Sequence, residues 1–145
     1  MRVVGLDLGQ RRIGVAVSDG TATLASPWGT LERSGDAAAD RAAVVAVVDE
    51  VEAARVVVGL PLSLNGRRGP AARATEAEVA ALGEALASRG VEVEAFDERF
   101  TTVSADRALA QAGVAPRRRR LHVDAAAATV LLQAWLDGRA RRGHG

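Results

Sequence analysis

The sequence contains no cysteine, no lysine and no tyrosine, and aromatic residues make up only 3% of its 145 residues. The absence of cysteine excludes disulfides and thiolate metal sites and favours a reducing compartment. No apolar run approaches the ~20 residues that span a bilayer, and no secretory leader is visible. We therefore expect a cytoplasmic protein with no membrane partner, whose core consists of valine, leucine and alanine.

All 19 basic residues are arginine, for which a coding bias towards Arg, Ala and Gly is the simplest explanation. The net charge of +1 conceals an asymmetry along the chain. Residues 1–116 contain 12 arginines and 16 acidic residues, whereas residues 117–145 contain 7 arginines and 2 aspartates. A weakly acidic body with a basic end could bind a polyanion through that end.

The length and the 48% hydrophobic content predict one folded domain over residues 1–138, followed by a flexible basic tail at 139–145. Predicted strands cover residues 3–8, 13–18, 22–32, 55–61 and 91–98. Predicted helices cover 37–53, 71–89, a segment from Thr101 or Thr102 to Gly113, and 121–138. In the first of them, Val44, Val47, Val48 and Val51 recur at helical spacing and predict an apolar stripe. This order predicts an α/β fold with a mixed sheet, because the first two strands form an antiparallel hairpin and the later ones need helical crossovers.

Asp7 stands inside the first strand, in "VGLDLGQRRIGVAVSD" (residues 4–19), where an uncompensated charge is unfavourable. Gly5 and Gly9 share its strand face and are expected to leave open space beside the carboxylate. Such space suits a metal ion or a closely approaching phosphate backbone. From this stretch alone, an aspartate hydrogen-bonded to a neighbouring loop is an equally good interpretation.

Further carboxylates stand at two other structural junctions. Asp97 and Glu98 end a predicted strand in "FDERFTT" (residues 96–102), where open α/β sheets place their ligand crevices. Asp124 falls in line with the apolar stripe of the last predicted helix, near its start. The alternatives are an ordinary acidic strand end followed by a helix cap, and an aspartate that complements the helix dipole.

Carboxylates from three distant segments provide the oxygen ligands that Mg²⁺ or Mn²⁺ prefers. Two such ions ~3.5–4 Å apart could activate a water and stabilise the leaving oxygen in phosphodiester hydrolysis. A zinc site is disfavoured because the only histidines are His122 and the tail residue His144. No serine or cysteine nucleophile has a supporting His and Asp in a recognisable arrangement.

Four segments, "GLDLGQRRIGVAVSD", "VVVGLPLSLNGRRGP", "DERFTT" and "VDAAAATVLL", resemble the YqgF/RuvX family in their order and separations. The resemblance covers roughly residues 2–136. Members of that family are described as Holliday-junction resolvases and as nucleases that mature the 5′ end of pre-16S ribosomal RNA. The resemblance implies a ribonuclease H-like fold, with a central five-stranded sheet and helices on both faces.

The resemblance places the catalytic, metal-binding carboxylates on Asp7, Glu98 and Asp124, with two Mg²⁺ or Mn²⁺ ions expected. Regular strand alternation would turn Asp97 to the opposite side from Glu98, so Glu98 is favoured as the ligand. The expected nucleic-acid-binding residues are Arg11, Arg12, Asn65, Arg67, Arg68, Arg99, Arg117, Arg118, Arg119 and Arg120. The residues expected at turns or close approaches are Gly5, Gly9, Gly59, Pro61 and Gly66.

The chain departs from the family pattern in two places. The family often has a lysine shortly before the final aspartate, whereas this chain has the run Arg117–Arg120. A guanidinium is a planar fork rather than a compact ammonium, so this change bears on how substrate is held. Leu62 stands where a basic residue often follows the Gly-Leu-Pro segment. Neither change removes a carboxylate.

The expected function is metal-dependent phosphodiester hydrolysis in the maturation of the 5′ end of pre-16S rRNA, part of ribosome biogenesis. One alternative is a Holliday junction resolvase of DNA recombination and repair, which would normally be a homodimer because two strands must be cut. The others are a nucleic-acid-binding module without catalysis and an actin-like phosphotransferase, for whose second lobe 145 residues leave no room. Contacts to a nucleic-acid backbone carry no sequence information, so the residues do not decide between RNA and branched DNA.

Overall fold

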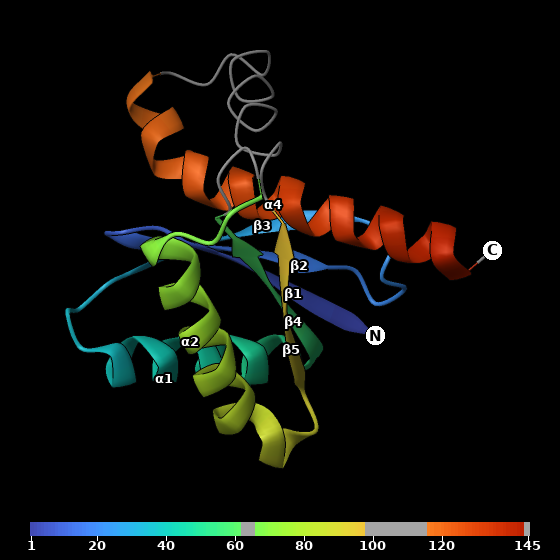
Figure 1. The fold of residues 1–145 in the computed structure, drawn as a ribbon. Coiled ribbons are helices and arrows are strands. Elements are labelled where there is room, and N and C mark those ends of the chain that lie inside the picture. Colours follow the sequence, from blue (N-terminus) through green and yellow to red (C-terminus); the bar gives the residue numbers. More distant parts are fainter. Residues whose placement is uncertain (62–65, 98–115, 144–145) are drawn as a thin grey trace.

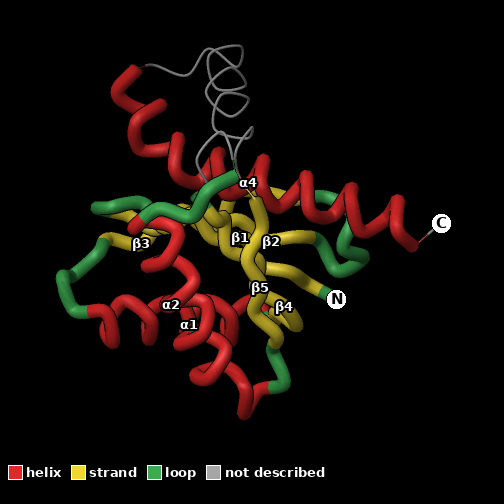
Figure 2. Tube along the Cα trace, in the orientation of Figure 1, coloured by secondary structure: helices red, strands yellow, loops and turns green. Residues whose placement is uncertain are grey.

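A computed structural model describes residues 1–61, 66–97 and 116–143, with the side chains of the last helix described from Ala125 onward. A five-stranded sheet separates two helical layers (Figures 1 and 2). The strands are β1 (Arg2–Leu8), β2 (Arg12–Ser18), β3 (Ala25–Glu32), β4 (Ala53–Leu60) and β5 (Glu92–Asp97). The prediction of a mixed five-stranded sheet with helices on both faces is confirmed.

The sheet has the strand order β3-β2-β1-β4-β5. The predicted hairpin is present, since β1 and β2 pair antiparallel, and β3 continues the antiparallel part. By contrast, β1 pairs parallel with β4, and β4 pairs parallel with β5. The carboxyl ends of β1, β4 and β5 therefore lie at one edge of the sheet, which we call the carboxyl edge.

One face of the sheet is covered by α1 (Ala37–Val51) and α2 (Pro70–Leu86), which is followed by the short 3₁₀ helix η1 (Ala87–Arg89) (Figure 1). The predicted apolar stripe of α1 is confirmed, because Val44, Val47 and Val48 are buried. These three side chains join Leu82 and Leu86 of α2 and the inward residues of β1 and β4 in one core. Asp36 begins α1 by accepting a hydrogen bond from the Ala38 N–H at 3.0 Å.

The opposite face is covered by the long helix α4 (Pro116–Gly143) alone among the described elements (Figure 1). Its contribution to a second core consists of Ala128, Leu132, Trp135 and Leu136. Gln133 fixes the helix to the β2–β3 connection. Its Oε1 accepts a hydrogen bond from the Ala25 N–H at 2.8 Å, and its Nε2 donates to the Thr23 carbonyl at 3.0 Å.

α4 runs antiparallel to β1 (Figure 1) and packs closely against it at Gly5. A Cβ atom built on Gly5 would lie 2.8 Å from Leu132 Cβ and 3.2 Å from the Ala128 carbonyl oxygen. Further along the helix, Trp135 lies 5.8 Å beneath the guanidinium of Arg55, near the beginning of β4. The expectation of open space beside Gly5 is therefore wrong, because α4 fills that space.

α4 is longer than its sequence predicts. The prediction began the helix at residue 121 and ended it at 138, whereas the structure begins it at Pro116 and ends it at Gly143. The predicted flexible tail is thus helical as far as Gly143. Proline is favoured at a first helical position, and Arg139 lies 6.0 Å over the Trp135 ring one turn earlier. No helix of the described ranges is long and apolar enough to cross a membrane.

Candidate active site

Asp7 lies one residue before the end of β1, opposite Gly14 of β2, and is half-buried. Side chains alternate along a strand, and Val3 and Gly5 both face α4. Asp7 therefore belongs to the α4 face of the sheet, at the carboxyl edge. Its backbone carbonyl accepts a hydrogen bond from the Gly9 N–H at 3.1 Å, which starts the turn into β2.

The end of β5 lies at the same carboxyl edge, two strands away from Asp7. In β5, Val93 packs against the α1/α2 core and Phe96 against the α4 core. Alternation places Asp97, which pairs with Leu60 of β4, on the α1/α2 face. Two strand spacings correspond to about 10 Å between the β1 and β5 backbones. Glu98 and Arg99 follow Asp97 directly and lie outside the described residues.

Asp124 lies on α4 one turn before Ala128, with its side chain outside the description. Because Ala128 lies against Gly5, the preceding turn of α4 is directed towards the carboxyl end of β1. From Ala128 back to Asp124, the helix advances about 6 Å, and from Gly5 to Asp7 the strand advances about 7 Å in the same direction. The backbone at position 124 therefore lies at about the same level as the backbone at position 7. The side chains that the structure describes include no cluster of three or more His, Asp or Glu able to hold a metal ion. The three-carboxylate site thus stays a prediction.

The structure pairs two of the arginines predicted to bind nucleic acid with acidic side chains. Arg12 Nε lies 3.0 Å from Glu32 Oε1, and Arg68 Nε lies 3.6 Å from Glu76 Oε1. Arg11 is exposed in the β1–β2 turn. Both paired guanidiniums remain at the surface, where such pairs are weak and can exchange an acidic partner for a phosphate.

The remaining predicted residues fall near the same edge or outside the description. Gly66 adopts a φ of 81°, which favours glycine, and Arg67 follows it as an exposed residue. Asn65 lies outside the described residues, and so do the side chains of Arg117–Arg120, which occupy the first turns of α4. Gly59 pairs with Phe96 between β4 and β5.

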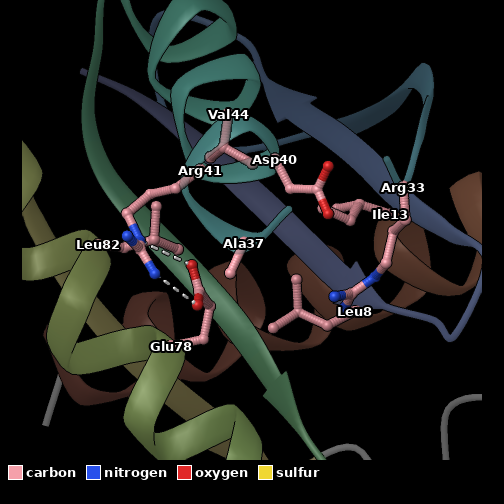
Figure 3. Close-up of a pocket in the computed structure, with 9 residues that line it drawn as sticks. All are labelled: Leu8, Ile13, Arg33, Ala37, Asp40, Arg41, Val44, Glu78 and Leu82. Carbon is pink, nitrogen blue, oxygen red and sulfur yellow. Dashed lines mark hydrogen bonds and ion pairs between the residues drawn. The ribbon is translucent and has the colours of Figure 1, made fainter. Parts of the chain in front are cut away.

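Sequence reasoning missed a groove at the carboxyl edge, on the α1/α2 face. It lies between the β1–β2 turn and the beginning of α2, and its lining comprises Leu8, Gly9, Gln10, Arg33, Pro61, Ala71, Ala74, Thr75 and Glu78. Arg33 also lines the adjoining hollow beside α1 (Figure 3). In the sequence, Arg33 stands in a polar turn with no recognisable motif. The pairing of Glu32 with Arg12 between β3 and β2, and the hydrogen bond from the Arg33 N–H to the Arg11 carbonyl at 2.9 Å, bring it to the hairpin tip.

The acidic side chains near this groove already have partners. Glu78 of α2 accepts two hydrogen bonds from Arg41 of α1, at 3.0 and 3.1 Å (Figure 3). Asp40 accepts hydrogen bonds from the backbone N–H and the hydroxyl of Ser34, at 2.9 and 2.8 Å. These bonds, with a smaller contribution from the charge of Arg33, lower the pKa of Asp40 below its ordinary value of 3.8.

Comparison with known proteins gives a family match and similar relatives over nearly the whole chain. The family model "RuvX: Holliday junction resolvase" matches residues 1–138. A protein of Myxococcus xanthus is 46% identical over 137 residues, covering 94% of this chain and 88% of the relative. A protein of Rhodococcus opacus is 44% identical over 146 residues, covering 97% of this chain and 79% of the relative. Both carry the name "Putative pre-16S rRNA nuclease".

Solved structures share the fold at low sequence identity. RuvC of T. thermophilus, in complex with a Holliday junction substrate, has a TM-score of 0.60 and 21% identity, covering 97% of this chain and 96% of that one. The fowlpox virus resolvase, in complex with Holliday junction DNA, has a TM-score of 0.59 and 9% identity, covering 96% and 99%. These likenesses confirm the ribonuclease H-like fold. With this fold, and with the family model matched over residues 1–138, the chain belongs to the RuvX family of nucleases.

Proposed function

We propose that this nuclease hydrolyses phosphodiester bonds with two Mg²⁺ or Mn²⁺ ions held by Asp7, Glu98 and Asp124. The observation that carries the proposal is the position of Asp7, on the α4 face at the carboxyl edge. The turn of α4 that contains residue 124 lies on this face of the sheet and is directed towards this edge. Glu98 directly follows β5, whose end lies at that edge. Carboxylates are the ligands that these ions prefer.

When bound, the ions supply an activated water and stabilise the leaving oxygen. The residues of the chain position the carboxylates and bind the substrate. β1 is hydrogen-bonded to β2 and β4 and buried between the two helical layers, which gives the Asp7 backbone a fixed position. Gly5 allows the close approach of α4 that brings residue 124 towards the same edge. Arg11, Arg67 and Arg68 lie at exposed positions from which they bind backbone phosphates.

The proposed substrate is the 5′ precursor segment of 16S rRNA, and the proposed location is the cytoplasm. The names of the relatives from M. xanthus and R. opacus support this choice. The second candidate is a Holliday junction, which the likeness to two solved resolvase–junction complexes favours. The two candidates differ in symmetry, because resolution of a junction requires paired cuts and hence two copies of the site.

A cleavage assay on both substrates separates the two candidates. The purified protein is incubated with Mg²⁺ and either an RNA fragment that carries an unprocessed 16S 5′ end or a synthetic four-way junction. We expect cleavage of the RNA within its precursor segment and an intact junction. Asp7→Asn serves as the control for contaminating nuclease, and the oligomeric state is measured at the assay concentration. Paired symmetric cuts in the junction by a dimer, with intact RNA, would establish the resolvase instead.

A further inference from the structure

The groove at the carboxyl edge and the predicted metal site lie on opposite faces of the same strand end. Asp7 faces α4, whereas the next residue, Leu8, lines the groove on the α1/α2 side. Gly9 and Gln10 continue the lining from the hairpin tip. A nucleic-acid strand that leaves the predicted cleavage site across this edge would pass directly over the groove.

Thr75 gives the groove a buried polar group that has no hydrogen-bond partner among the described residues. This residue of α2 is only 6% exposed and lines the groove. Its hydroxyl forms no hydrogen bond with any residue that the structure describes. By contrast, the hydroxyl of Thr129 in α4 donates to the Ala125 carbonyl at 2.7 Å. Buried hydroxyls nearly always have a hydrogen-bond partner in the protein, in water or in a ligand, so the Thr75 hydroxyl is a donor that a ligand in the groove can engage.

Arg33 gives the same groove a positive charge available to a ligand. Its guanidinium is exposed and forms no ion pair within the described part of the chain. Glu78 is already paired with Arg41 (Figure 3). Asp40 accepts its hydrogen bonds from Ser34, and the charge of Arg33 makes only a smaller contribution at this carboxylate. The groove therefore offers a guanidinium and a hydroxyl as donors, with the exposed amide of Gln10 beside them.

We infer that this groove binds a phosphodiester group of the substrate strand, outside the cleavage site, through Arg33 and Thr75. This inference rests on the proposed nuclease function. A phosphate oxygen would accept the hydrogen bond that Thr75 cannot make within the described protein, and Arg33 would neutralise the phosphate charge. The groove would position the strand relative to Asp7 without taking part in the chemistry.

Binding of a labelled single-stranded RNA oligonucleotide, measured in EDTA, tests the groove separately from cleavage. Arg33→Gln should weaken binding roughly tenfold and reduce the slope of log affinity against log salt by about 0.7. Thr75→Val keeps the side-chain shape and should also weaken binding by up to roughly tenfold. The matched control is Arg73→Gln, which removes an exposed charge from α2 outside the groove and should leave affinity unchanged.

Stability measurements distinguish a ligand-binding Thr75 from a structural one. Since its hydroxyl has no partner in the described protein, Thr75→Val should leave the free energy of unfolding unchanged or higher. A lower stability for Thr75→Val, wild-type RNA affinity for both groove variants, or an equal loss with Arg73→Gln would each overturn the inference. None of these results would affect the proposed function, which depends on metal-dependent cleavage and on Asp7.

Discussion

Asp7→Asn should lose nearly all nuclease activity while remaining folded. The amide keeps the size and shape of the side chain but removes the charge that is proposed to hold the metal ions. Loss of metal-assisted catalysis corresponds to several kcal/mol of transition-state stabilisation, or about a thousandfold in rate. Glu98→Gln and Asp124→Asn should show similar losses if all three carboxylates hold the ions. Initial cleavage rates at saturating substrate and Mg²⁺ measure the effect.

Asp97→Asn is the matched control for these variants. Asp97 also ends a parallel strand at the carboxyl edge, but it lies on the α1/α2 face, opposite to Asp7. We expect this variant to keep most of the activity. Mg²⁺ should raise the Tm of the wild type and raise that of Asp7→Asn much less, because only the intact site binds the ion well. A wild-type rate for Asp7→Asn would remove this carboxylate from the mechanism.

Gly5→Ala should destabilise the protein by about 1–3 kcal/mol, the usual cost of overpacking a core. The added Cβ would lie 2.8 Å from Leu132 Cβ and 3.2 Å from the Ala128 carbonyl oxygen. Both atoms have positions fixed by the backbone of α4, so the helix itself must move away from β1. Because α4 also carries Asp124, we expect the cleavage rate to fall together with the stability.

Gly83→Ala provides the control for the glycine substitution. Gly83 lies inside α2, and a Cβ built on it meets no atom within 4 Å. Alanine is the better helix former, so this variant should be more stable by about 0.5–1 kcal/mol. Urea denaturation of both variants measures the two effects. Equal stability of Gly5→Ala and the wild type would show that α4 does not pack against β1 as closely as described.

The sequence was sufficient to predict those helices and strands in which apolar residues recur in a clear pattern. The spacing of Val44, Val47 and Val48 predicted the buried stripe of α1, and the two apolar runs that flank residues 9–12 predicted the hairpin. The end of α4 was predicted too early. Gly138 and the arginines after it resemble a frayed tail in isolation, whereas in the structure Arg139 stacks on Trp135.

The candidate site was predictable only in part, because its geometry depends on tertiary contacts. The sequence indicated Asp7 as an unusual strand residue. It could not show that the space beside Gly5 is occupied by Leu132. Arg33 belongs to no motif and reaches the groove through its backbone hydrogen bond to Arg11. Contacts between residues far apart in the chain leave no periodic signal in the sequence.

The most direct test of the central claim is cleavage of the precursor RNA by the wild-type protein in Mg²⁺ and in excess EDTA. An identically purified Asp7→Asn preparation, assayed in parallel, reports any contaminating nuclease. If carboxylates hold the catalytic ions, the protein cleaves the RNA in Mg²⁺, does not cleave it in EDTA, and recovers full activity when Mg²⁺ is restored. Undiminished cleavage by the wild type in EDTA, with an inactive Asp7→Asn preparation, would contradict the metal-dependent mechanism.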